Sequence, residues 1–154
     1  MPALLHKDKL LELFAKEMYT DNYFLYMGYA HGHSLPTIDD ADNKYQYAVV
    51  NSENNVIGYL SYRVCGDSVI NFGLYSFDKG NPVIGRDLFE ELERLVSHYH
   101  RVEWCMVSGN PVKKHYDRYC KYHGGNMVVL HDNVRDNYGN YHDTYIYEIV
   151  NKEK

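Results

Sequence analysis

The sequence lacks the features that mark membrane proteins and nucleic-acid-binding proteins. No apolar run reaches the roughly 20 residues of a membrane-spanning helix, and the first residues lack the charged-then-apolar pattern of a signal peptide. Basic residues are fewer than acidic ones, 16 against 21, so the formal charge is −5. Duplex binding needs a clustered basic surface. We therefore expect neither a nucleic acid nor a membrane as a partner.

Cysteine is scarce as well, and this bears on redox and metal chemistry. The three cysteines, Cys65, Cys105 and Cys120, are spaced too widely for a local metal or redox pair. Each falls within a predicted strand or helix, so we expect free, buried thiols in a reduced, cytoplasmic protein. The histidine pairs in His31-Gly32-His33 and His98-Tyr99-His100 have no third ligand at a usable spacing, so no metal is expected.

Tyrosine, in contrast, is abundant. There are 17 tyrosines in 154 residues, and hydrophobic residues make up 45 % of the chain. Tyrosine supplies apolar area together with a hydroxyl group, which suits half-buried strands and the walls of clefts. The length is enough to close a core without disulfides, and no repeat or linker divides the chain. We expect a single domain over residues 1–154.

Hydrophobic periodicity predicts four helices and six strands. The helices are expected at residues 4–18, 23–30, 85–98 and 112–123. The strands are expected at residues 45–50, 56–65, 69–77, 101–108, 127–131 and 141–150. Hairpin-length turns join the first three strands, whereas later strands alternate with helices. This order predicts an α/β (mixed α+β) fold, with a mixed, mostly antiparallel central sheet and helices on both faces.

Residues 79–92 form a glycine-flanked loop that runs into an amphipathic helix directly after a strand. A helix N-terminus exposes unpaired amides and the positive end of a dipole, which favours phosphate oxygens. Gly85 would allow close backbone approach, and Lys79 and Arg86 add positive charge. The alternative interpretation is an ordinary Gly-Asn-Pro turn before a helix, with no ligand.

Three places in the chain carry a resemblance to a known family. They are the strand, loop and helix at residues 69–92, the strand end Ser108-Gly109-Asn110 before the next helix, and the strand pair after Gly124-Gly125. Together with the element order, they resemble the GNAT-type acyl-CoA-dependent N-acetyltransferases over residues 4–150. The resemblance implies the acyl-CoA N-acyltransferase-like fold.

The coenzyme loop departs from the pattern of that family. The family has Gln or Arg, two residues, Gly, one residue, and then Gly or Ala. Only Gly85 matches, because Gly80 and Val83 stand at the other two signature positions. Pro82, between them, has no amide to donate.

The resemblance implies transfer of an acetyl group from acetyl-CoA, as acyl-donor co-substrate, to a primary amine of a small molecule or peptide. Attack would be direct, in a ternary complex, with the oxyanion held by a backbone amide near Leu74 or Tyr75. The coenzyme-binding residues that it implies are Leu74, Tyr75, Phe77, Lys79, Gly80, Val83, Ile84, Gly85, Arg86 and Asn110.

Two tyrosines are candidates for the acid that protonates the leaving thiolate. Both lie on the helical stripe that faces the sheet, and a phenol can donate a proton. Tyr119 is the first choice and Tyr116 the second. Core packing is the alternative role for both. Glu103 is the candidate base, and Asn71 or Tyr75 could instead hold a water.

A second class of function stays open. A domain with this fold could bind a ligand or a protein without catalysis, after loss of the standard coenzyme loop. The oligomeric state is open too, with a homodimer among the options.

Overall fold

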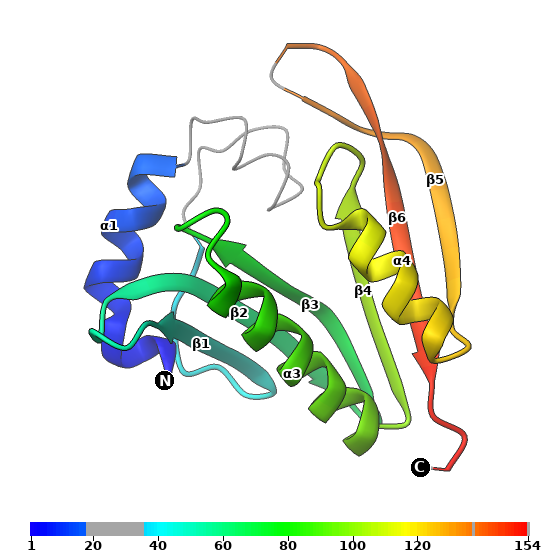
Figure 1. Ribbon diagram of the computed structural model, residues 1–154, viewed down its shortest axis with the longest axis horizontal. Coiled ribbons are helices and arrows are strands. Elements are labelled where there is room, and N and C mark those ends of the chain that lie inside the picture. Colours follow the sequence, from blue (N-terminus) through cyan, green and yellow to red (C-terminus); the bar gives the residue numbers. More distant parts are fainter. Residues whose placement is uncertain (18–35, 137, 154) are drawn as a thin grey trace.

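The computed structural model describes residues 1–17, 36–136 and 138–153 (Figure 1). Its helices are α1 (Lys7–Glu17), preceded by the short 3-10 helix η1 (Ala3–His6), α3 (Pro82–His98) and α4 (Lys113–Tyr122). Its strands are β1 (Lys44–Val50), β2 (Val56–Cys65), β3 (Ser68–Ser76), β4 (Arg101–Val107), β5 (Asn126–Arg135) and β6 (Tyr141–Val150). The helix expected at residues 23–30, and His31 and His33, lie outside the described residues.

The six strands form one sheet in the order β1-β2-β3-β4-β6-β5. Only β3 and β4 pair in parallel, and the other four pairs are antiparallel. Among the described helices, none is long and apolar enough to cross a bilayer. The predicted mixed, mostly antiparallel sheet is confirmed.

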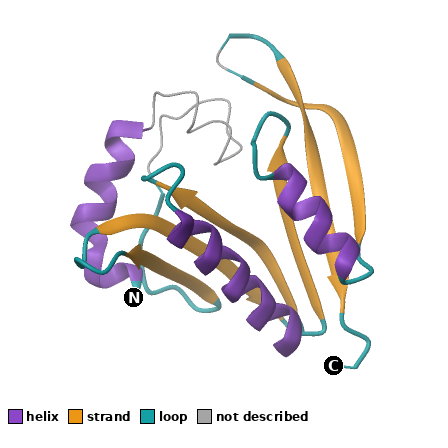
Figure 2. Cartoon of the chain, in the orientation of Figure 1, coloured by secondary structure: helices purple, strands orange, loops and turns teal. Residues whose placement is uncertain are grey.

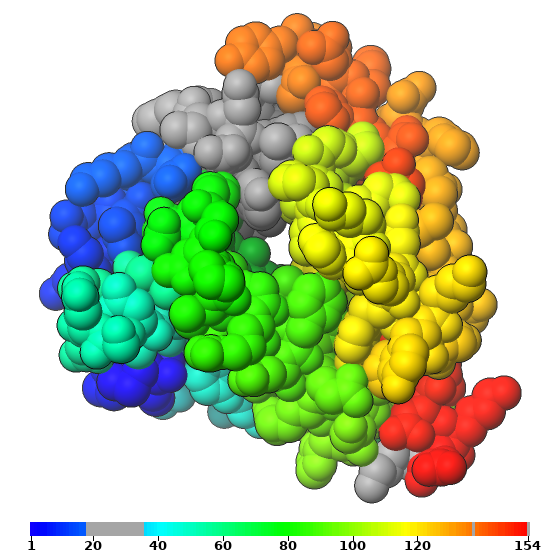
Figure 3. All heavy atoms as spheres, viewed as in Figure 1, coloured from blue at the N-terminus to red at the C-terminus, as the bar shows by residue number. Residues whose placement is uncertain are grey.

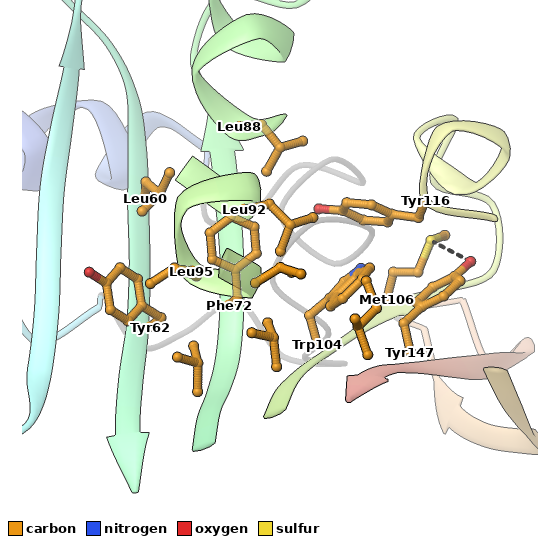
Figure 4. Close-up of a cluster of buried hydrophobic side chains, with 14 of the residues drawn as sticks. Leu60, Tyr62, Phe72, Leu88, Leu92, Leu95, Trp104, Met106, Tyr116 and Tyr147 are labelled. Atoms are coloured by element: carbon orange, nitrogen blue, oxygen red, sulfur yellow. Dashed lines mark hydrogen bonds between the residues drawn. The ribbon is translucent and has the colours of Figure 1, made fainter. Parts of the chain in front are cut away.

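Helices cover the two faces of the sheet, as Figures 1 and 2 show. On one face α3 and α4 bury the larger core, in which Leu88, Leu92 and Leu95 of α3 point toward the sheet (Figure 4). On the other face α1 buries Leu10 and Phe14 in a smaller cluster. The strands serve both cores because successive side chains alternate between faces.

Helix α3 begins at Pro82, earlier than the predicted start at Gly85. Asn81 is its N-cap and accepts a hydrogen bond from the Val83 amide at 3.0 Å. Proline is favoured at the first helical position because its ring fixes φ and no amide is lost there. The loop before α3 is therefore shorter than expected, and Gly85 lies within the helix.

Strands β3 and β4 separate halfway along the sheet. They pair at Val69 with Val102 and at Phe72 with Trp104, with an irregularity between these positions, and no further pair follows. Asn71, within the irregularity, has a φ of 58°. A bulge of this kind bends a strand and disturbs its pairing. The two strands diverge beyond it and leave an opening in the middle of the sheet.

The cysteines are less buried than the sequence indicated. Cys120 is buried, but Cys65 and Cys105 are exposed, so the expectation for these two was wrong. Cys65 ends β2 beside a hairpin turn. Cys105 alternates with Trp104 and Met106, which are buried beneath the helices, so its side chain faces the opposite side.

The two glycines after α4 have different roles. Gly124 has a φ of 67° with open space around it, whereas a Cβ on Gly125 would lie 2.5 Å from the Glu148 carbonyl oxygen. We expect Gly124→Ala to cost about 1 kcal/mol through backbone strain. Gly125→Ala should cost about 3 kcal/mol, because the β6 backbone would have to move. Urea unfolding measures both, and equal costs would contradict this packing.

Candidate functional site

The opening between β3 and β4 leads into a cavity of about 830 Å³. Figure 3 shows a hollow between α3 and α4 at this place. The wall is formed by the end of β3, the first turns of α3 and α4, the end of β4, and part of the β5–β6 pair. The sequence-predicted site residues on the wall are Leu74, Lys79, Gly80, Ile84, Gly85, Arg86, Asn110 and Tyr116.

Other predicted site residues do not line the cavity. The rings of Tyr75 and Phe77 pack against Phe14 of α1, at centroid distances of 5.2 and 4.8 Å, on the opposite face of the sheet. Val83 packs against the larger core. Neither Tyr75 nor Phe77 therefore contributes a side chain to the cavity wall.

The first amides of α3 already have hydrogen-bond partners within the chain. Pro82 has no N–H, and the Val83 amide donates to the side chain of Asn81. The Ile84 amide donates to the Asn81 carbonyl at 3.1 Å. The helix N-terminus thus offers an anion fewer free amides than the sequence interpretation assumed.

The two predicted cations near the loop have different surroundings. The Lys79 ammonium donates to the Ser76 carbonyl and lies 4.6 Å from the centroid of the Tyr75 ring. Burial lowers the pKa of this ammonium. Arg86 is 62 % exposed, and its nearest carboxylates, on Asp87 and Glu90, are 3.4 and 4.0 Å away. Arg86 is therefore the more accessible cation.

The backbone of β3 directs an amide toward the opening. The Phe77 amide donates to the Ile57 carbonyl of the β2 side at 2.9 Å. In an antiparallel pair, N–H groups alternate between the two sides of a strand. The amide of Leu74 therefore points away from β2 and toward the side where β4 has separated. Of Leu74 and Tyr75, the former has its N–H on the open side.

Tyr116 contributes a phenol to the cavity wall. Its side chain is 5 % exposed and packs at the edge of Trp104 and Phe89, with centroids 5.6 and 6.0 Å away. In Figure 4 its hydroxyl points away from α4 toward the α3 side. Tyr116 is the candidate acid that the structure places at the opening.

Tyr119 lies one turn further along α4 and does not line the cavity. Its hydroxyl donates to the Glu93 carboxylate of α3 at 2.5 Å, and His123 contacts the same oxygen at 3.1 Å. Burial, and then the bond to Glu93, hold the pKa of this phenol above its ordinary value. Tyr119 joins the two helices across the sheet.

Glu103, the candidate base, also lies off the cavity wall. Its carboxylate accepts from Arg101 at 2.8 Å, and Arg101 also contacts Glu148 of β6 at 2.8 Å. Asn71 is exposed at the bulge and is likewise absent from the wall. His100, from the second histidine pair, contacts the Asn151 carbonyl at 3.0 Å.

Trp104 lies beneath the opening, between two tyrosines. Its ring stacks on Tyr147 of β6, with centroids 5.3 Å apart and an interplanar angle of 14°. The Tyr147 hydroxyl donates to Asp117 at 2.6 Å, and Lys113 donates to the same carboxylate at 2.6 Å. The buried indole N–H has no hydrogen-bond partner in the described part of the chain. This network fixes the inner face of α4 against the sheet.

Sequence reasoning missed several residues of the wall. Phe89 and His115 face each other from α3 and α4, with ring centroids 6.5 Å apart. Cys105, Asn133 and Thr144 come from the strands. The helical stripe of α3 could have indicated Phe89. Asn133 lies where the pairing of β5 with β6 is irregular, between Leu130 and Val134, beyond the predicted end of this strand at residue 131.

The described wall of the cavity lacks the acidic side chains that are abundant elsewhere in this chain. The sequence carries 21 acidic residues, but no Asp or Glu of the described segments lines the cavity. The wall instead includes Lys79, Arg86 and His115, and most of the remainder is apolar. A cavity of this kind suits a ligand with an apolar part and an anionic part.

His142, at the start of β6, makes a contact that depends on pH. Its ring contacts Asp136 and the Ser108 carbonyl, both at 2.9 Å. The Asp136 bond is the main cause that raises the pKa of His142. This contribution to stability is present below the ordinary histidine pKa and is lost as pH rises through the raised value.

Asp136→Asn should therefore lower the free energy of unfolding more at pH 6 than at pH 8. Asn keeps an oxygen for the Tyr138 and Asn140 amides, so the loop itself is retained. Urea unfolding at the two pH values measures the gap between wild type and variant. A difference in unfolding free energy that grows with pH would contradict the pairing of Asp136 with His142.

Comparison with solved structures identifies the architecture. Spermidine N-acetyltransferase from Vibrio cholerae, in complex with CoA and spermine, superposes with a TM-score of 0.66 at 14 % identity, over 91 % of this chain and 89 % of that chain. A probable GNAT-family acetyltransferase from Chromobacterium violaceum gives 0.64 at 18 % identity, over 97 % and 84 %.

The ribosomal-protein-S18-alanine N-acetyltransferase from Escherichia coli gives a TM-score of 0.58 at 15 % identity, over 72 % of this chain and 71 % of that chain. No protein-family model and no curated protein sequence matches the chain. The chain has the GNAT-type N-acetyltransferase fold, as the sequence resemblance implied.

Proposed function

We propose that this chain, which has the GNAT-type fold, is an N-acetyltransferase that transfers an acetyl group from acetyl-CoA to a primary amine. One observation carries the proposal. The cavity where β3 and β4 diverge has the phenol of Tyr116 on its wall and the N–H of Leu74 on its open side. The described part of this wall has no carboxylates. An apolar thioester arm with an anionic end fits such a wall.

The residues present fit the donor. Asn110 begins the segment before α4, where its side chain accepts from the Val112 amide at 3.0 Å, and it lies on the wall. Leu74, Ile84 and Leu88 supply apolar surface on the other side. We expect these groups to hold the acyl-bearing arm between α3 and α4.

Transfer would proceed by direct attack. The lone pair of the amine forms the N–C bond at the thioester carbonyl, and the C–S bond then breaks. The Leu74 N–H would donate to the carbonyl oxygen as negative charge develops there. Tyr116 would give its proton to the departing thiolate and regain one from solvent.

The proton of the amine would leave through water. Glu103 is held by Arg101 away from the cavity wall, so it is not placed to accept this proton directly. The acceptor class stays broad. The similar structures include an enzyme in complex with CoA and spermine, and an enzyme named as a ribosomal-protein-S18-alanine N-acetyltransferase. Either a polyamine or a peptide amine is therefore consistent with the fold.

A thiol-release assay tests the activity. Purified protein is mixed with acetyl-CoA and either spermidine or an alanine-terminated peptide, and free CoA thiol is followed over time. Acceptor-dependent release supports the proposal. Release with neither acceptor class, in the presence of measurable acetyl-CoA binding, would favour the second candidate.

That second candidate is a non-catalytic binding domain with the same fold. It is favoured by the first turn of α3, where Asn81 and Pro82 leave few amides for a coenzyme pyrophosphate. The assay separates the two candidates because only the enzyme releases thiol.

A further inference from the structure

The first turn of α3 is poorly suited to hold phosphates through its backbone. Asn81 occupies the Val83 amide with its side chain and the Ile84 amide with its carbonyl, and Pro82 has no amide. The Asn81 amide itself donates to the Asp78 carbonyl at 3.2 Å. If the proposed coenzyme binds here, its phosphates need other donors.

Among the described residues, three side chains on the cavity wall can donate as a cation or an imidazole: Lys79, Arg86 and His115. Lys79 is directed to the Ser76 carbonyl and the Tyr75 ring, toward the face that α1 covers. Arg86 and His115 have exposed side chains, so they lie at the mouth of the cavity.

Arg86 and His115 flank the same end of the cavity. The His115 ring lies 6.5 Å from the ring of Phe89, which brings α4 close to α3 at this point. Arg86 precedes Phe89 by three positions on α3, and residues at this spacing share one helix face. Arg86 and His115 therefore lie on opposite sides of the opening, one on α3 and the other on α4.

Helix α4 adds positive charge on the outside of this end. Its sequence contains Lys113, Lys114, Arg118 and Lys121 but only one acidic residue, Asp117. Lys113 is paired with Asp117 at 2.6 Å, and Lys114 and Arg118 are exposed. In a chain of net negative charge, this face would favour the approach of an anion to the mouth.

We propose that the phosphates at the nucleotide end of the coenzyme are bound by the side chains of Arg86 and His115 across the cavity mouth, in place of the first-turn amides of α3. This inference rests on the proposed function. Arg86 can donate two parallel hydrogen bonds to phosphate oxygens, and a ring N–H of His115 can donate a third.

Calorimetric titration with CoA, dephospho-CoA and pantetheine tests the inference. Arg86→Met and His115→Phe should each weaken CoA binding by about 10-fold, as expected for loss of a hydrogen bond to a charged group. Pantetheine has no phosphate, so its affinity should be unchanged in both variants. Arg63→Met is the matched control, because Arg63 is exposed on β2 and does not line the cavity.

The dephospho-CoA arm identifies the phosphate. A loss that persists with dephospho-CoA assigns the pair to the pyrophosphate, and a loss that vanishes assigns it to the 3′-phosphate. CoA binding that is unaffected by both variants, or weakened equally by Arg63→Met, overturns the inference and leaves the proposed function standing. No CoA binding by the wild type would instead overturn the proposed function.

Discussion

Tyr116→Phe is expected to lower kcat for acetyl transfer by about 100-fold or more, while coenzyme affinity stays close to that of the wild type. The phenol on the cavity wall would donate the proton that the leaving thiolate needs, and positioned general acids contribute factors of roughly 10²–10⁴. The phenyl ring keeps the packing against Trp104 and Phe89, so the fold should persist.

Tyr119→Phe is the matched comparison on the same helix. Its hydroxyl contacts Glu93 and lies away from the cavity, so the variant should lower stability slightly and reduce kcat by less than about 10-fold. Single-turnover rates, with circular dichroism to verify folding, distinguish the two. A larger loss in Tyr119→Phe than in Tyr116→Phe would refute the assignment of the acid.

Trp104→Ala is expected to cost about 3–5 kcal/mol of unfolding free energy. The indole is 1 % exposed, stacks on Tyr147 and supports Tyr116, so its loss leaves a void beneath the opening. The variant should also lose activity, because the support for the phenol of Tyr116 disappears.

Tyr122→Ala is the control for this prediction, since Tyr122 is 83 % exposed. Its cost should stay within about 0.5 kcal/mol. Urea unfolding followed by circular dichroism serves for both variants, because Trp104 is the single tryptophan and its fluorescence is lost in the variant. A cost for Trp104→Ala near that of the control would show that the ring does not fill the core as described.

Much of the fold could be predicted because its elements are long and periodic. The strand ends at Val50, Cys65 and Val150 agree with the predicted ends. The start of α3 was missed although a signal was present. Asn81 followed by Pro82 is an N-cap followed by a first-turn proline, a pattern that also suits the loop expected before Gly85.

The choice between the two tyrosines could not be made from the sequence. Tyr116 and Tyr119 are three positions apart, so they share one face of α4. What separates them is Glu93, which is distant in sequence and binds the hydroxyl of Tyr119. Such long-range contacts carry no local pattern.

The cavity itself also depends on long-range geometry. The divergence of β3 and β4 follows an irregularity at Asn71, and Asn133 enters the wall through a second irregularity in β5. Asn is depleted in strands, so each position indicates a local break in a strand, but neither indicates that the break opens a cavity. The partner of the Val83 amide, in contrast, is the one that an Asn N-cap implies.

Isothermal titration of acetyl-CoA into the full chain tests the central claim most directly. A donor held between α3 and α4 should bind at one site per chain, with a dissociation constant between roughly 1 μM and 1 mM, as for most enzyme substrates. Absence of saturable binding up to several millimolar acetyl-CoA, by protein that is folded by circular dichroism, would contradict the assignment of the cavity as the donor site.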